Sequence, residues 1–384
     1  MAGFLIGPLS GMSGMSGMSG MSGMSGVDYT AINSPLVAEA LIRSRDGTVG
    51  TWEDPVAKFA KENLGLDQPG FLERWSPDVR AEIYDAEVFS RLCFGTNSRD
   101  SVYLWHLELE PTQPANTGLP SHPTPKLHEL VTITRPSRDV FAQQLRMVAS
   151  YADLRSDRLV EIIAQLGDPF AFLGSVVNLH PTRSRWTFEL LSLALRLAHF
   201  GVQRIKHALA CPRPSDLSSQ IQPIIQVPGH GTLPSGHATE AFVTAVILHE
   251  LTGGDTHVGT HLFRLAARIA INRTIAGVHF PVDSVAGAML GLTLGKYLLA
   301  RAAPAGQTPY DAWHFNGAHY EPSEDFDWTL LYDASQGDQM ALSSYVHKLG
   351  VQHSATVPHV RDETLPSPIL GWLFTKAKSE WSVA

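Results

Sequence analysis

The sequence predicts an all-α fold, a helical bundle with irregular flanking segments. Apolar residues recur at helical spacing through residues 137–151 and 184–210, and three further apolar segments follow between residues 236 and 300. Helix-starting serines and prolines and helix-ending glycines and prolines bound several of these segments. A chain of 384 residues, 44% hydrophobic and 17% charged, has the length and composition of a globular protein with a sizeable core.

The flank before this bundle is expected to be irregular. Residues 1–29 include five Gly-Met-Ser repeats, a low-complexity tract that cannot pack a core, so we predict a flexible N-terminus. Residues 30–129 are mixed, with a short strand expected at 105–110 and a loop rich in proline after it. No signal peptide is recognisable, and the longest apolar stretch, residues 285–295, is too short for a membrane span. A cytoplasmic location follows as an expectation.

The helical catalytic core is placed at residues 130–303. A first helix starts after Ser137 and runs to about residue 151, and a second covers about 156–166. A long helix over 184–210 ends before Pro212 and Pro214. Further helices are expected from the turn at residues 235–237 to residue 251, over 256–275, and from Pro281 to about residue 300. Residues 304–384 form a tail on the core, mostly loops, with a helix or two near 335–349.

Charge and cysteine content narrow the class of protein. A net charge of −8 argues against nucleic acid or an anionic membrane as the main partner. Any cluster of cations is therefore a local feature. The two cysteines, Cys93 and Cys211, give no framework of disulfides and favour a reducing compartment.

Lys206 and Arg213 form the first candidate anion-binding motif. Lys206 lies near the end of the long helix, and Arg213 stands between two prolines in Cys-Pro-Arg-Pro. The prolines restrict the backbone that carries the guanidinium, and an arginine fork beside a lysine suits an oxyanion. The alternative is a surface helix end whose cations face the helix dipole.

Ser235, Gly236 and His237 form the second motif, at the start of an apolar helix. Free N–H groups at a helix start attract anions, and glycine permits close approach of the backbone. The alternative is a serine N-cap with a nearby histidine.

Arg273, His279 and Asp283 form the third motif. Asp283 follows His279 by four residues, a spacing that lets the carboxylate hold one ring nitrogen and leave the other as nucleophile or metal ligand. The alternative is a satisfied core histidine near an aspartate in a helix first turn. Because all three motifs occur in order, a shared oxyanion site is favoured.

The pattern K-x6-R-P, P-S-G-H and R-x5-H-x3-D resembles the vanadium-dependent haloperoxidase and type 2 phosphatidic acid phosphatase (PAP2) superfamily, over about residues 200–290. One departure is Asn272, where the family usually has serine. The resemblance implies a helical bundle and the following roles. The oxyanion would be held by Lys206, Arg213, Ser235, Gly236 and Arg273. His237 would be the general acid–base, Asp283 would orient His279, and His279 would attack phosphorus or bind vanadium.

Among the members of this superfamily, the sequence most resembles the haloperoxidases. His230 lies seven residues before His237 and resembles the second active-site histidine that algal bromoperoxidases carry at this offset, which implies a catalytic role for it. The motif continues Ala-Thr, and over a hundred residues precede the core. The resemblance thus implies vanadate as cofactor and hydrogen peroxide, bromide or iodide, and a small organic substrate as partners. The alternatives are an acid phosphatase with a phosphohistidine intermediate, in which His230 is a loop residue, and a non-catalytic oxyanion binder. The apolar flanks and tail offer a surface for a homo-oligomer.

Overall fold

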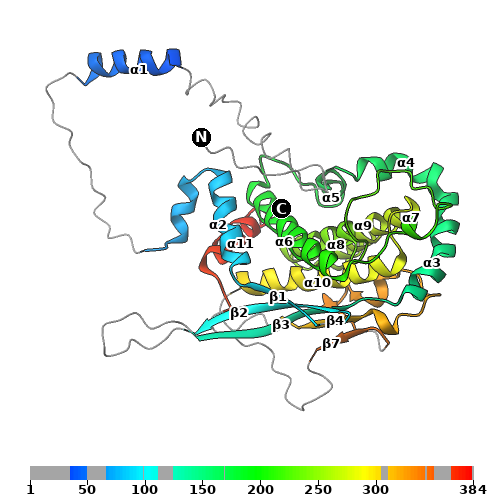
Figure 1. Cartoon of the computed structure of the whole chain (residues 1–384). Coiled ribbons are helices and arrows are strands. Elements are labelled where there is room, and N and C mark those ends of the chain that lie inside the picture. Colours follow the sequence, from blue (N-terminus) through cyan, green and yellow to red (C-terminus); the bar gives the residue numbers. More distant parts are fainter. Residues whose placement is uncertain are drawn as a thin grey trace.

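The computed structural model describes residues 35–49, 66–97, 99–110, 124–167, 169–303, 310–341, 344–349 and 365–382. A group of long helices forms the centre, and one β-sheet lies across it (Figure 1). The predicted flexible N-terminus, residues 1–29, lies outside the described residues. The proposed division of the chain into core and flanks stays a prediction.

Four long helices make the core: α6 (Arg185–Leu209), α8 (Gly236–Leu251), α9 (Thr256–Ile275) and α10 (Pro281–Ala302). Helix α8 packs against the other three. Helix α10 is buried along its whole length except at Lys296. A helix that is apolar all round must be covered on every side, so α10 forms the centre of the molecule.

Glycines spaced four residues apart on α10 bring α8 unusually close. A Cβ atom at Gly287 would lie 2.5 Å from the Ser235 carbonyl oxygen, and one at Gly291 would lie 2.4 Å from the Thr239 carbonyl oxygen. The starts of the two helices are also joined, because the Ser235 N–H donates to the Asp283 carbonyl oxygen at 2.9 Å. This contact holds the second and third sequence motifs side by side.

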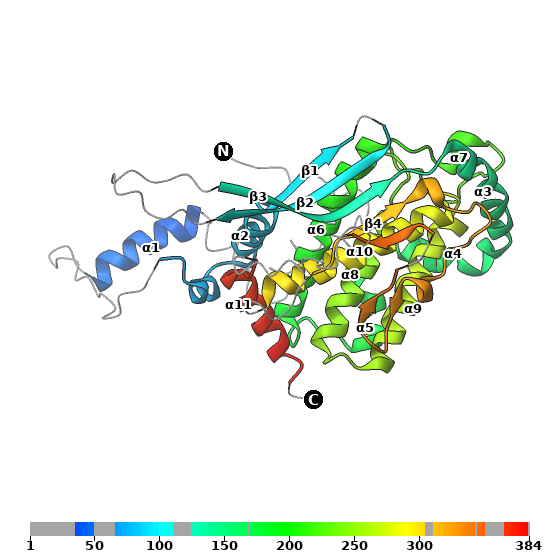
Figure 2. The same ribbon diagram turned by 90° about the horizontal axis from the view of Figure 1, so that it is seen from below.

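The sheet has five strands in the order β1-β2-β3-β4-β7. These strands are β1 (Leu92–Thr96), β2 (Ser101–Glu110), β3 (Thr124–Thr134), β4 (Trp313–Asn316) and β7 (Val346–Lys348). All pairs are antiparallel except β3 with β4, which is parallel, with Val131 opposite Trp313. Strands β3 and β4 contact α10, and β2 contacts α6 (Figure 2). The sheet thus covers a side of the core that the helices leave open.

The all-α prediction is therefore wrong. Only the strand at 105–110 was expected, and it is the second half of β2. Strands β1 and β3 were also missed, although each pairs with β2, its neighbour in sequence. Strand β4 joins β3 across about 180 residues of sequence, so no local pattern indicates that pairing. The apolar residues of α10 that the sheet covers do not indicate, in the sequence, that strands pack against them.

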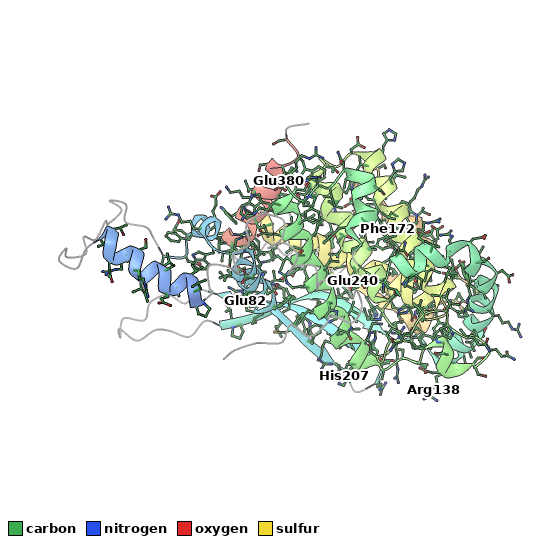
Figure 3. The ribbon with its side chains drawn as sticks, turned by 90° about the horizontal axis from the view of Figure 1, so that it is seen from above. Glu82, Arg138, Phe172, His207, Glu240 and Glu380 are labelled. Carbon is green, nitrogen blue, oxygen red and sulfur yellow. The ribbon has the colours of Figure 1, made fainter. Side chains whose placement is uncertain are left out.

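The other helices surround the core. They are α1 (Pro35–Thr48), α2 (Pro77–Phe89), α3 (Arg138–Ser150), α4 (Arg155–Ala164), α5 (Phe170–Val177), the short α7 (Pro214–Leu217) and α11 (Pro368–Ser379). Helix α11 packs on α6 and α10. Glu380 lies beside the end of α11 (Figure 3). Its carboxylate accepts hydrogen bonds from the Trp186 and Thr187 amides at 2.8 and 2.9 Å and caps α6.

The predicted core helices are confirmed within one or two residues, including Ser137 as an N-cap. The helices expected near 335–349 are wrong. The described part of that range holds β7 and part of a two-stranded sheet of β5 (Tyr332–Asp333) and β6 (Asp338–Gln339). Helices α1, α2, α5, α7 and α11 were not predicted. Among the helices of the described residues, none combines the length and apolar character that crossing a bilayer requires.

Candidate active site

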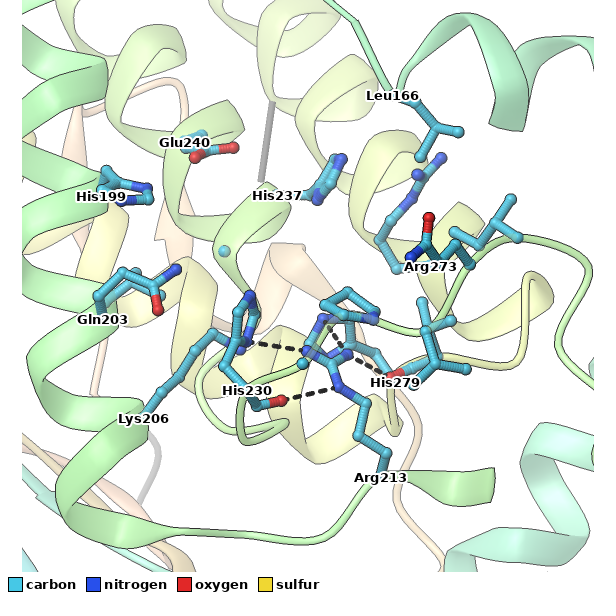
Figure 4. Close-up of a pocket in the computed structure, with 18 residues that line it drawn as sticks. Leu166, His199, Gln203, Lys206, Arg213, His230, His237, Glu240, Arg273 and His279 are labelled. Carbon is cyan, nitrogen blue, oxygen red and sulfur yellow. Dashed lines mark hydrogen bonds between the residues drawn. The ribbon is translucent and has the colours of Figure 1, made fainter. Parts of the chain in front are cut away.

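The three sequence motifs meet around one cavity of about 350 Å³ (Figure 4). Seven of the nine predicted site residues line it: Lys206, Arg213, His230, Gly236, His237, Arg273 and His279. The other two, Ser235 and Asp283, are fully buried behind the wall. The volume lies at the lower end of the range for small-molecule sites.

Arg213 is held by main-chain carbonyl groups of two loops. Helix α6 ends at Leu209, and the extended chain that follows brings Arg213 back beneath the cavity. Its guanidinium donates to the Val278 carbonyl oxygen at 2.8 Å and to the His230 carbonyl oxygen at 3.1 Å. Its Nη1 also lies 3.3 Å from His279 Nε2. The fork is thus fixed beside the candidate nucleophile.

Lys206 is buried and donates to the Gly231 and Thr232 carbonyl oxygens at 2.9 and 2.7 Å. An ammonium group has three N–H donors, so one remains for a ligand. Burial, followed by the nearby Arg213, holds the pKa of Lys206 well below its usual value. An anion in the cavity would relieve both effects.

Arg273 gives the clearest sign that the cavity suits an anion. It is fully buried, and its Nη2 donates to the Ile162 carbonyl oxygen at 3.1 Å and to Gln165 Oε1 at 3.2 Å. Its Nε and Nη1 are also buried, and no described residue accepts a hydrogen bond from either. Burial lowers the pKa of Arg273 to about 10. Leaving charged donors buried without partners is costly, so these donors suit an oxyanion bound in the cavity.

His279 is oriented by a buried carboxylate and a hydroxyl. Its Nδ1 lies 3.0 Å from Asp283 Oδ2 and 3.1 Å from Thr232 Oγ1, and the Thr232 hydroxyl donates to the same carboxylate oxygen. The Phe280 amide also donates to Asp283 Oδ2, at 2.8 Å. With Asp283 accepting from Nδ1–H, Nε2 keeps its lone pair.

The charge state of this pair favours a nucleophilic imidazole. Burial, followed by Arg213, holds the pKa of His279 well below its usual value. Burial raises the pKa of Asp283 to about 6, against the hydrogen bonds from Thr232 and Phe280. Near neutral pH the pair is therefore a carboxylate beside a neutral ring.

His237 lies on the first turn of α8, which Ser235 caps by accepting from the Ala238 N–H at 3.4 Å. Its Nε2 lies 3.2 Å from the Gln165 carbonyl oxygen, to which it donates, so Nδ1 is left to exchange a proton. Burial and then Arg273 lower the pKa of His237. The Gly236 and His237 amides stand at the helix start, where N–H groups have no partner within the helix.

Sequence reasoning missed two residues that hold this site together. Thr232 lies three residues before Ser235. Its position between His230 and His237 was the only feature of the sequence that could have indicated a place in the site. Gln165, at the end of α4, links Asn272 to Arg273: Asn272 Nδ2 donates to Gln165 Oε1 at 2.9 Å, and the same oxygen accepts from Arg273. The unusual Asn272 thus helps to position the cation next to it.

Comparison with known proteins identifies the family of the core. Residues 189–304 match the PAP2 superfamily, so the chain carries a PAP2 superfamily domain. A curated relative, decaprenylphosphoryl-5-phosphoribose phosphatase of Mycolicibacterium smegmatis, is 32% identical over 91 residues, 24% of this chain. The chain spans about half the length of that relative, 47%. A transmembrane PAP2 type phosphatidylglycerolphosphate phosphatase from Bacillus subtilis is 22% identical, with a TM-score of 0.33 over 41% of this chain and 84% of that one.

The haloperoxidase prediction is wrong, because the core matches the PAP2 superfamily and its curated relative is a phosphatase. The motifs misled because one oxyanion site serves both chemistries. His230, which favoured a peroxidase, contacts Arg213, and its predicted catalytic role stays a prediction. Its ring Nδ1 lies 3.1 Å from Arg213 Nη2, and its carbonyl oxygen accepts from Arg213 Nε. It positions a cation. The predicted vanadate, peroxide, halide and organic partners remain without a test.

Proposed function

We propose that this chain, whose residues 189–304 form a PAP2 superfamily domain, is a phosphatase that hydrolyses phosphate monoesters through a phosphohistidine at His279. The carrying observation is the buried guanidinium of Arg273, whose Nε and Nη1 have no hydrogen-bond partner among the described residues, beside the oriented His279–Asp283 pair. Three buried cations, Lys206, Arg213 and Arg273, supply the charge that a phosphoryl group needs. The match to a phosphatase adds support.

The first half of the reaction transfers the phosphoryl group to the protein. His279 Nε2 attacks phosphorus with its lone pair while the bond from phosphorus to the ester oxygen breaks. His237 gives a proton to the departing oxygen, which leaves as an alcohol. Asp283 stabilises the positive charge that develops on the His279 ring, and the three cations hold the equatorial oxygens.

The second half returns the enzyme to its starting state. A water molecule attacks phosphorus opposite His279, and His237, now neutral, takes its proton. The bond between His279 Nε2 and phosphorus breaks, and inorganic phosphate leaves. Vanadate, predicted as a cofactor, would act in this reaction as a phosphate mimic that inhibits. A cytoplasmic location and a homo-oligomer stay predictions.

The test is hydrolysis of p-nitrophenyl phosphate and ribose 5-phosphate by the full chain, with and without orthovanadate. We expect phosphate release that vanadate suppresses, and a phosphoenzyme that is stable in alkali and labile in acid. His279→Ala should abolish both. His237→Ala should slow turnover while the protein still binds phosphate. Absence of hydrolysis from the wild-type protein, or a phosphoenzyme that persists in His279→Ala, would refute the proposal.

A further inference from the structure

The cavity holds a second polar group beyond the oxyanion site. His199, Gln203 and Lys206 are spaced by four and three residues on α6, so they form one stripe along the helix. Glu240 follows His237 by three residues on α8 and lies on the same face. All of these side chains line the cavity, with His199 and Glu240 at some distance from Arg213 and His279 (Figure 4). Helix α6 thus presents His199 and Gln203 beside Lys206, and helix α8 presents Glu240 beside His237.

Glu240 is the part of this group that demands a ligand. Its side chain is only 5% exposed, and no described residue forms a hydrogen bond with its Oε2. A buried carboxyl oxygen without a partner is costly, and an apolar residue in the wall would avoid that cost. None of the steps proposed for phosphoryl transfer uses Glu240. A ligand that hydrogen-bonds it would recover the loss.

The protonation states of the group indicate which ligand fits. Burial raises the pKa of Glu240 to about 8, against the charge of Lys206. At neutral pH it is largely a neutral acid, which can donate one hydrogen bond and accept others. Burial lowers the pKa of His199, so that ring is neutral as well. Gln203 adds an amide with both donors and an acceptor.

We propose that Glu240, Gln203 and His199 form a subsite for hydroxyl groups on the alcohol portion of the phosphate ester. The inference rests on the proposed function and makes the substrate a polyol or sugar phosphate. Hydroxyl groups both donate and accept hydrogen bonds, and these three neutral side chains need ligand groups that do both. The phosphoryl group is proposed to use Lys206, Arg213 and Arg273 together, and the residues proposed for the rest of the substrate are neutral, so they suit hydroxyl groups rather than a second phosphate. A cavity of about 350 Å³ suits a phosphoryl group on a compact carbon skeleton.

The test compares two esters that differ only in hydroxyl groups, glycerol 3-phosphate and propyl phosphate, with p-nitrophenyl phosphate as a reference. For the wild-type chain we expect kcat/KM to favour glycerol 3-phosphate on the order of tenfold or more. Glu240→Leu should lower that preference about threefold to tenfold, the effect of one lost hydrogen bond, and leave propyl phosphate hydrolysis close to wild type. Gln203→Leu should act in the same direction.

Two further variants keep the result interpretable. Glu240→Gln retains hydrogen-bonding groups and should keep part of the preference, which separates recognition from misfolding. His249→Leu removes another buried polar side chain of α8 that lies outside this cavity, and the preference should not change.

A wild-type protein without preference for glycerol 3-phosphate, or a preference that survives in Glu240→Leu, would overturn the subsite. So would an equal loss on all three esters in Glu240→Leu, because Glu240 would then act on the oxyanion site. If the wild type hydrolyses no ester, the proposed function fails, and calorimetric binding of the two esters tests the subsite instead. Equal affinities of the wild type would then refute it, and tighter glycerol 3-phosphate binding that Glu240→Leu abolishes would support it.

Discussion

Replacing Asp283 with asparagine tests the catalytic pair most directly. Asp283 Oδ2 accepts from His279 Nδ1, from the Phe280 amide and from the Thr232 hydroxyl, while Oδ1 is buried without a partner among the described residues. The new amide group has two placements. With its NH₂ at Oδ1, a donor is buried unpaired. With its NH₂ at Oδ2, it faces the Phe280 N–H and reverses the hydrogen bond to His279.

Both placements weaken His279 as a nucleophile. The first removes the negative charge that stabilises the developing imidazolium, and the second moves the ring proton to Nε2, which then has no lone pair to attack phosphorus. The same change in a serine–histidine–aspartate triad lowers kcat by about 10⁴-fold. We therefore expect Asp283→Asn to lower kcat by about 10³-fold to 10⁴-fold, with a small change in KM.

Thr232→Val is a second variant, and its effect should be smaller than that of Asp283→Asn. It has nearly the same shape and removes one hydrogen bond to the Asp283 carboxylate, so kcat should fall only about threefold to tenfold. Steady-state and single-turnover hydrolysis of p-nitrophenyl phosphate, with circular dichroism to confirm folding, measures both variants. A loss smaller than tenfold in Asp283→Asn, or a larger loss in Thr232→Val than in Asp283→Asn, would refute the assigned roles.

Three other outcomes follow from the geometry. Gly291→Ala places a Cβ atom 2.4 Å from the Thr239 carbonyl oxygen and should lower the free energy of unfolding by about 1–3 kcal/mol in urea denaturation; unchanged stability would contradict the close helix contact. Arg80 and Glu189 form a buried ion pair, so Arg80→Met leaves a buried charge unpaired and should destabilise the protein by about 3–5 kcal/mol. The double variant with Glu189→Leu removes both charges and should destabilise it by less, as thermal unfolding would measure. Burial and Arg273 lower the pKa of His237, and a bound phosphate raises it. Activity should therefore fall as pH rises through this pKa, and the midpoint should lie at higher pH in the profile of kcat than in that of kcat/KM. Identical midpoints in the two profiles would contradict the role of His237 as the acid.

The part of the site that could be predicted is the part encoded over short distances in sequence. His279 and Asp283 are four residues apart, and Ser235 precedes the helix it caps, so their relation follows from helix geometry. The partners of Arg273 could not be found in this way. Ile162 and Gln165 lie more than 100 residues earlier, at the end of a different helix, and neither carries a charge that would suggest contact with a cation.

The sequence by itself determined the core helices, because caps, breakers and helical periodicity act between near neighbours. Its three motifs also named the side chains predicted to bind an oxyanion. Only the tertiary structure decided that a sheet covers α10 and that His230 holds Arg213. It alone also showed that Glu240 lines the cavity with a buried oxygen that has no partner in the described part of the chain. Pairing of β3 with β4, burial and pKa shifts arise from groups that are distant in sequence and adjacent in space. Their energies depend on residues that cannot be identified from a local sequence pattern.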